Sequence, residues 1–73
     1  MTCFKPDGSL TALARALLNL IDQPLGAGVI AKELDHPLFL VRSSLRELIA
    51  ARLVEDLGDQ YQITALGIEK RAL

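Results

Sequence analysis

The chain alternates between amphipathic segments and short polar breaks. Near its start, four leucines recur at steps of three and four residues: Leu10, Leu13, Leu17 and Leu20. This spacing is that of one helix face, so it predicts a first helix over 10–21, with Ser9 as its N-cap. Further apolar residues extend almost around this helix, a pattern typical of burial on two sides, the second of which could be another subunit.

Pro24 and Pro37 mark the next two breaks, because proline does not fit inside a helix. Between them, the apolar positions predict a short helix over 27–34, with an inner face of Ile30, Ala31 and Leu34. A third helix is predicted over 38–52, with Pro37 in its first turn and Asp35 or His36 as its cap. Its inner side is expected to carry Val41, Leu45, Leu48 and Arg52, flanked by Leu38, Ser44 and Ile49. Arg52 lies at the helix end, where its long side chain can leave the core for water.

Two short segments near the C-terminus alternate between apolar and polar residues. They predict strands over 53–57 and 60–64, and Gly58-Asp59 between them suits a two-residue turn with glycine first. Thr64 is a suitable N-cap for a last short helix over 65–72. The fold class is therefore mainly α with a small β-hairpin.

Composition places the chain among small single domains. It has 73 residues, 51% of them hydrophobic and only 4% aromatic, so the core must be aliphatic. Residues 1–8 are expected to be a flexible lead-in, and residues 9–73 the folded domain. A chain this short has little room inside for its apolar side chains, which favours a dimer or another partner.

Cys3 is the one cysteine, so no internal disulfide is possible and a reducing cytoplasm is expected. We expect Cys3 itself to be an inert residue near the chain end. The longest apolar stretch, 16–21, is interrupted by Asn19 and is too short to span a bilayer. A soluble cytoplasmic protein is therefore predicted.

The order helix, helix, break, helix, hairpin, helix resembles the winged helix-turn-helix superfamily. The segments that carry the resemblance are Val29–Leu34, Val41–Leu48, Ala51–Val54 and Tyr61–Gly67. It implies a three-helix core with a two-stranded wing and a short C-terminal helix. It also implies a small prokaryotic transcription regulator that binds double-stranded DNA sequence-specifically, with its third helix in the major groove. A homodimer through the first and C-terminal helices is the expected assembly.

The family's DNA-contacting positions fall on the outward face of the third helix. Arg42 and Arg46 lie four residues apart and could reach phosphates or a guanine edge. Ser43 could bond a base or a phosphate, and Lys32 on the second helix could add a phosphate contact. The candidate DNA-binding residues are Phe39, Arg42, Ser43, Arg46 and Lys32.

Three features favour an alternative, a winged-helix module or subunit that contacts proteins and does not bind DNA. Phe39 and Leu40 stand in the first turn of the third helix, and an exposed phenylalanine is typical of a protein interface. The wing is acidic, with Glu55, Asp56 and Asp59, and the net charge of −1 with pI about 5.7 does not favour DNA.

The residues needed for catalysis or metal binding are lacking in the sequence. His36 is the only histidine and has no cysteine nearby to share a zinc ion. Ser43-Ser44 has no candidate base, and Gly26-Ala27-Gly28 lacks the rest of a phosphate-binding loop. We therefore expect no enzyme activity, no cofactor and no metal.

Overall fold

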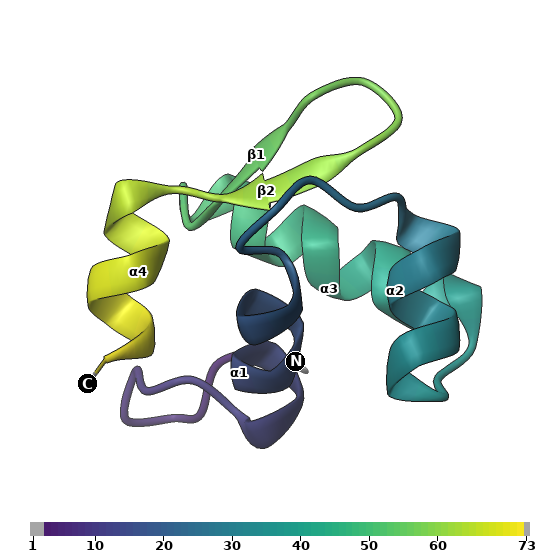
Figure 1. The fold of residues 1–73 in the computed structure, drawn as a ribbon. Coiled ribbons are helices and arrows are strands. Elements are labelled where there is room, and N and C mark those ends of the chain that lie inside the picture. The colour runs from purple at the N-terminus through teal and green to yellow at the C-terminus, as the bar shows by residue number, and fades with distance from the viewer. Residues whose placement is uncertain (1–2, 73) are drawn as a thin grey trace.

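The computed structural model describes residues 3–72, which form four helices and one antiparallel hairpin (Figure 1). The elements are α1 (Ala12–Leu20), α2 (Ala27–Leu34), α3 (Leu38–Ala50), β1 (Val54–Asp56), β2 (Tyr61–Ile63) and α4 (Ala65–Arg71). A small α+β fold is thereby confirmed. Residues 1–2 of the expected lead-in and residue 73 of the expected domain lie outside the described residues.

The first helix begins two residues later than predicted, and Ser9 is not its cap. Thr11 is the N-cap, and its Oγ1 accepts a hydrogen bond from the N–H of Ala14 at 3.3 Å. Ser9 instead donates its N–H and its hydroxyl to Oδ1 of Asp7, at 2.9 and 2.7 Å. The prediction was wrong because the Ser9 side chain serves the preceding turn, where Leu10 pairs with Phe4 in a β-bridge.

The segment before α1 contributes to the core, in contrast to the flexible lead-in expected from the sequence. Cys3 is 0% exposed, and Leu10 is also buried. The N–H of Thr11 donates to the carbonyl of Cys3 at 3.0 Å, and Phe4 packs against the core. Figure 1 shows this segment lying beside α1. One side of the broadly apolar α1 is therefore covered by its own chain.

The buried face of α1 is rotated relative to the predicted leucine stripe. Leu10 and Leu17 are buried as predicted, whereas Leu13 and Leu20 are only half-buried. The fully buried positions of α1 and its C-cap are Ala14, Leu17, Leu18 and Ile21. The rotation arises because α1 packs against both α2 and α4, so its buried arc lies between the two contacts.

The helix α2 matches its predicted bounds and ends in a Schellman motif. The N–H of His36 donates to the carbonyl of Ala31 at 3.1 Å, and the N–H of Asp35 to that of Lys32 at 3.3 Å. Asp35 adopts the left-handed conformation that this motif needs, with φ 56°. Pro37 is the N-cap of α3 and no side chain caps the helix, so the predicted cap by Asp35 or His36 and the predicted place of Pro37 in the first turn were both wrong.

The helix α3 ends at Ala50, earlier than predicted, in a second motif of the same kind. The N–H of Leu53 donates to the carbonyl of Leu48, and Arg52 stands in the left-handed region with φ 65°. Arg52 is exposed, as expected of a charged side chain at this end, but it lies outside the helix and not in its last turn. The predicted core positions Val41, Ser44, Leu45 and Leu48 are buried, whereas Leu38 is exposed.

The hairpin is shorter than predicted but has the expected turn. Val54 pairs with Ile63 and Asp56 with Tyr61, and the N–H of Leu57 donates to the carbonyl of Gln60 across Gly58-Asp59. Gly58 has φ 108°, a conformation that glycine adopts without strain. The other edge of β2 bonds to the loop before α2, because Leu25 and Tyr61 exchange two backbone hydrogen bonds.

The predicted cap of the last helix is confirmed. Oγ1 of Thr64 accepts from the N–H of Gly67 at 3.0 Å, and its hydroxyl donates to the carbonyl of Arg52 at 2.7 Å. This residue therefore ties α4 to the turn that follows α3. Within the described part of the chain, no helix has the length and apolarity needed to cross a membrane.

Candidate nucleic-acid interface

An open groove of about 720 Å³ lies between the start of α2, the outer face of α3 and the hairpin. Ala27 and Val29 line it from α2, and Tyr61 lines it from the hairpin. Its floor includes Leu45 and Ile49 of α3. The groove is thus formed by three elements whose relative positions the core fixes.

Arg42 and Arg46 form the cationic wall of this groove. Both are exposed, and neither makes a hydrogen bond or an ion pair with any residue that the structure describes. The opposite side of α3 is anchored by the buried Val41 and Leu48. The two guanidinium groups are therefore presented to solvent by a fixed helix, where they are available to an anionic ligand.

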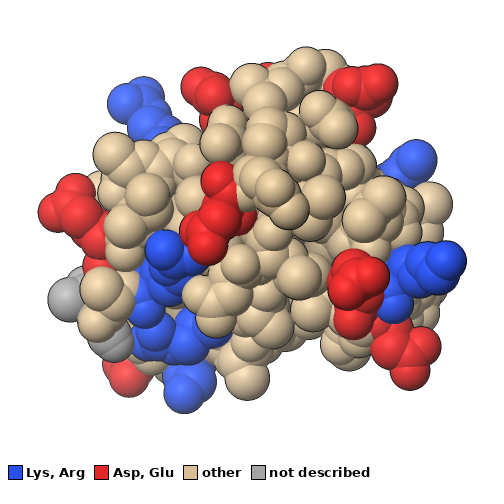
Figure 2. All heavy atoms as spheres, viewed as in Figure 1, with Lys and Arg blue, Asp and Glu red and all other residues tan. Residues whose placement is uncertain are grey.

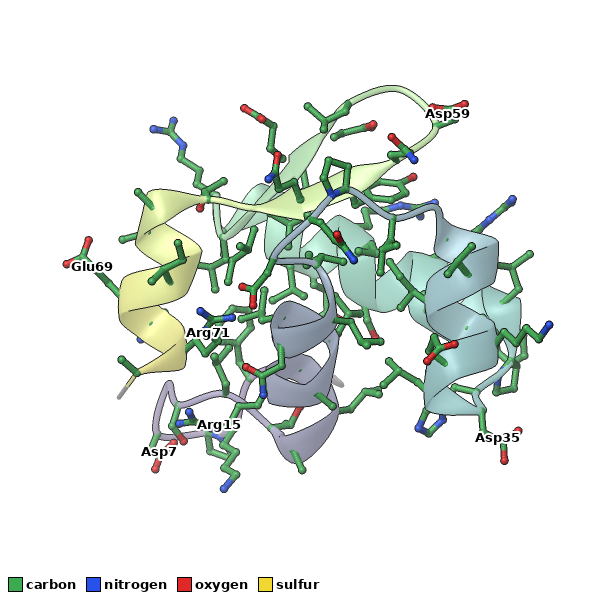
Figure 3. All side chains as sticks on the ribbon, in the orientation of Figure 1. Asp7, Arg15, Asp35, Asp59, Glu69 and Arg71 are labelled. Atoms are coloured by element: carbon green, nitrogen blue, oxygen red, sulfur yellow. The ribbon has the colours of Figure 1, made fainter. Side chains whose placement is uncertain are left out.

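Asp56 and Asp59 line the same groove from the hairpin and form its anionic wall. Oδ1 of Asp56 accepts a hydrogen bond from the N–H of Gly58 at 2.9 Å, which fixes the carboxylate at the start of the turn. Figure 3 shows Asp59 at the hairpin loop, and Figure 2 shows acidic side chains on both sides of the hairpin. One wall of the groove is positive and the other is negative.

The other candidate DNA-binding residues lie outside the groove lining. Phe39 is 76% exposed, one turn before Arg42, and Ser43 is exposed beside it on α3. Lys32 is exposed on α2, beyond the groove. Leu40, the other candidate for a protein contact, is half-buried. The structure therefore brings together two of the five candidates, and it leaves the other three on neighbouring solvent-facing surface.

The sequence did not indicate the residues that complete the groove. The sequence pattern indicates only that Val29 lies in a helix and Tyr61 in a strand. It does not indicate that the acidic wing faces the arginines across a shared groove. The signal for this arrangement is long-range, because it depends on how the hairpin folds back over α3. The bridge between Leu25 and Tyr61 fixes that placement by joining β2 to the loop before α2.

A second charged region joins α1 to α4. Nη1 of Arg15 donates to the carbonyl of Arg71 at 2.8 Å, and Nη1 of Arg71 forms an ion pair with Oδ1 of Asp22 at 2.7 Å. Arg15 and Lys70 line a smaller cavity of about 230 Å³ together with Asp7. Figure 2 shows Lys and Arg gathered at the lower left, where Figure 3 labels Arg15 and Arg71. This region fastens the end of α4 to the core.

Titratable groups offer little further chemistry. The pKa of Asp7 is lowered, chiefly by the hydrogen bond from the Ser9 hydroxyl and then by the bond from the Ser9 N–H. His36 is exposed at the turn between α2 and α3. Among residues 3–72, no three His, Cys, Asp or Glu side chains come together in a way that could hold a metal ion.

The chain matches no protein family, no curated protein and no solved structure. The candidate site therefore rests on its own geometry. Its chemistry is that of binding: two exposed arginines on a fixed helix face two carboxylates across an open groove.

Proposed function

We propose that this protein binds double-stranded DNA in the manner of a winged helix-turn-helix domain, with α3 in the major groove. The observation that carries the proposal is the pair Arg42 and Arg46, exposed and without partners among the described residues on the outer face of α3. Arginine binds phosphate oxygens and the O6 and N7 atoms of guanine through two parallel hydrogen bonds.

The geometry of α2 and α3 supports this proposal. The two helices pack against each other and are joined by the three residues 35–37, a connection length found in helix-turn-helix units. The 13 residues of α3 span roughly 20 Å, so a helix of this length can lie in the major groove. Ser43 and Phe39 on the same exposed surface would contact a base, a phosphate or a thymine methyl.

The start of α2 adds a favourable electrostatic feature. Gly26 is its N-cap and makes no side-chain capping bond, so the first backbone N–H groups of α2 have no side-chain acceptor. These groups lie at the positive end of the helix dipole, and Ala27 and Gly28 line the groove beside the arginines. A DNA phosphate near this helix end would accept hydrogen bonds from these backbone N–H groups and from the guanidinium groups of Arg42 and Arg46.

The hairpin plays a smaller part in the proposed complex. Asp56 and Asp59 would stand close to the phosphate backbone and repel it. Binding would then depend on α3 and Lys32, which implies few phosphate contacts and modest affinity. A role in transcription regulation follows from sequence-specific binding, and it stays a prediction.

The homodimer expected through α1 and α4 also stays a prediction. The apolar face of α1 is largely covered within the chain, because Ala14, Leu17 and Leu18 are fully buried. On α4, Leu66 and Ile68 are each 47% exposed, and they would form the seam. Such a dimer would present two copies of α3 to successive major grooves.

Fluorescence anisotropy with labelled genomic duplexes tests the proposal. Binding is expected at about 50 mM salt and should weaken steeply as the salt concentration rises. Arg42→Ala with Arg46→Ala should weaken binding at least tenfold. A matched control is Lys5→Ala with Arg52→Gly, which also removes two positive charges, but outside the groove. Absence of binding by the wild-type protein, or equal losses in both double variants, contradicts the proposal.

A second candidate function is a protein-binding module, and the exposure of Phe39 favours it. A phenylalanine that is 76% exposed on a helix is typical of the centre of a protein interface. Arg42→Ala with Arg46→Ala should leave a protein complex on Phe39 intact, whereas Phe39→Ser should abolish that complex while the fold persists. Circular dichroism would verify that this variant folds.

A further inference from the structure

The hairpin tip has a composition that complements the groove beside it. Leu57 at the tip is 46% exposed, an unusual position for a leucine on a charged turn. Asp56 precedes it and Asp59 follows it, so an apolar side chain stands between two carboxylates. A surface that receives this tip must offer an apolar contact between two cations.

The groove offers those features on the same molecule. Arg42 and Arg46 provide two cations on its α3 wall, one helical turn apart. Val29, which is 50% exposed, and the half-buried Ile49 provide apolar surface beside them. The chain therefore carries both a groove with a cationic α3 wall and an acidic tip with an apolar centre. Such self-complementarity is what a two-fold symmetric interface requires.

We propose that two copies of this chain form a two-fold dimer in which each hairpin tip enters the groove of the other copy. Leu57 of one copy packs on Val29 and Ile49 of its partner. The carboxylates of Asp56 and Asp59 pair with the partner's Arg42 and Arg46. The same contacts occur twice, because the symmetry axis exchanges the two copies.

The charges within a single copy do not satisfy one another. Asp56 and Asp59 line the same groove as Arg42 and Arg46, yet none of the four forms an ion pair. Within residues 3–72, the ion pair that the structure contains joins Arg71 to Asp22. A second copy brings opposite charges together at both grooves at once and excludes water from two exposed leucines.

The proposed seam differs from the one expected on α1 and α4. That seam would rest on apolar contacts of Leu66 and Ile68 on α4. The α3 wall of the groove and the hairpin tip add a match of positive with negative surface. The face of α3 and the hairpin is thus an alternative to the seam on α1 and α4, which would leave α3 of both copies exposed to DNA.

This arrangement also implies regulation, and that consequence rests on the proposed DNA binding. The dimer covers Arg42 and Arg46, the two residues proposed to contact DNA. Self-association and DNA binding are therefore mutually exclusive, and by linkage each weakens the other to the same extent. DNA should convert the dimer to DNA-bound monomers.

Sedimentation velocity of the full chain tests the interface without DNA. The wild-type protein is expected to pass from monomer to dimer as its concentration rises from about 10 µM to about 1 mM, and high salt should shift the transition upward. The variants R42E/R46E and D56K/D59K should each remain monomeric. Their equimolar mixture should dimerise, because reversed charges meet again across the heterodimer.

Matched controls make the result specific. Glu55→Lys makes the same charge change as D59K on the same hairpin, but Glu55 does not line the groove, so the dimer should persist. Leu57→Ser should weaken the dimer at least tenfold without any change of charge. If D56K/D59K does not fold, as judged by circular dichroism, the single variant D59K replaces it. An equimolar mixture of D59K with R42E/R46E then gives the same comparison.

Several outcomes overturn the proposal. These are a wild-type protein that stays monomeric to about 1 mM, charge-reversed variants that still dimerise, or a mixture that does not associate. A dimer lost on Leu66→Glu but kept in R42E/R46E would assign the seam to α4. The test is independent of the proposed function, since a protein that dimerises in this way but binds no duplex contradicts DNA binding alone.

Discussion

The thiol of Cys3 donates a hydrogen bond to the backbone carbonyl of Ser44, 3.4 Å away and 41 residues further along the chain. Ser44 is fully buried on the inner side of α3, whose outer side carries Arg42 and Arg46. The N-terminal segment is therefore fastened to the helix that forms the candidate site. Loosening this segment should affect the stability of the whole domain.

The first prediction concerns Cys3→Ala. The substitution removes a buried sulfur atom and leaves a small cavity, so the free energy of unfolding should fall by about 1–2 kcal/mol. Urea unfolding followed by circular dichroism measures the change. Lys5→Ala is the control, because an exposed side chain nearby should change stability by no more than about 0.5 kcal/mol. Equal effects of the two variants would show that the segment does not contribute to the core.

Elements with local signals were predicted well from the sequence. The bounds of α2 follow from Pro24, Pro37 and the apolar spacing between them, and Thr64 caps α4 as predicted. These features depend on residues within a few positions of one another. Local propensity and hydrophobic pattern suffice where no distant contact competes with them.

Features that depend on distant contacts, or on local hydrogen bonds that compete with the expected ones, were not predicted. Nothing near Cys3 in the sequence indicates Ser44 as its partner, and Ser9 resembles a cap as closely as Thr11 does. The spacing of Arg52 fits the predicted helix, but Arg52 itself adopts the left-handed conformation, and α3 ends two residues before it, at Ala50. Of the candidate site, the outer face of α3 could be predicted. The facing carboxylates could not, because tertiary packing positions the hairpin.

The second prediction compares one substitution at two glycines. A Cβ at Gly67 would overlap the backbone carbonyl of Leu53 and the side chain of Ile63, so Gly67→Ala should destabilise the protein by about 2–3 kcal/mol. A Cβ at Gly28, in the exposed first turn of α2, would meet no atom within 4 Å. Gly28→Ala should therefore stabilise the protein by about 0.5–1 kcal/mol.

Thermal and urea unfolding of both variants measure these two changes. The opposite signs make the pair informative, since a general effect of alanine on the chain would move both in one direction. No loss of stability in Gly67→Ala would contradict the close packing of α4 on Leu53 and Ile63, and a loss in Gly28→Ala would contradict the open space at the start of α2.

The third prediction concerns pH. The pKa of Asp7 is lowered in the folded protein by the hydroxyl and the N–H of Ser9, so its ionised form favours the folded state. A lowered folded pKa gives stability that is present above the unfolded pKa and is lost as pH falls through the folded pKa. Wild-type protein should therefore be more stable than Asp7→Asn at neutral pH, and this advantage should disappear in acid.

Carbon-detected NMR titration of the Asp7 carboxyl measures its pKa directly. In Ser9→Ala the hydroxyl is gone but the N–H remains, so the pKa should rise only part of the way to its ordinary value. An Asp7 pKa that does not change in Ser9→Ala would show that the turn before α1 is not held by this hydrogen bond.

The last prediction concerns the salt dependence of the proposed DNA complex. If Arg42, Arg46 and Lys32 each neutralise one phosphate, the plot of log K against log salt concentration should have a slope of roughly −3. Replacing Arg42 by alanine should make that slope shallower by about 0.9, because one fewer counterion is released. Arg52→Gly removes an arginine outside the groove and should leave the slope unchanged. Anisotropy titrations at protein concentrations well below the range expected for dimerisation give the slopes. An unaltered slope for Arg42→Ala would show that any phosphate contacts lie on another face of the domain.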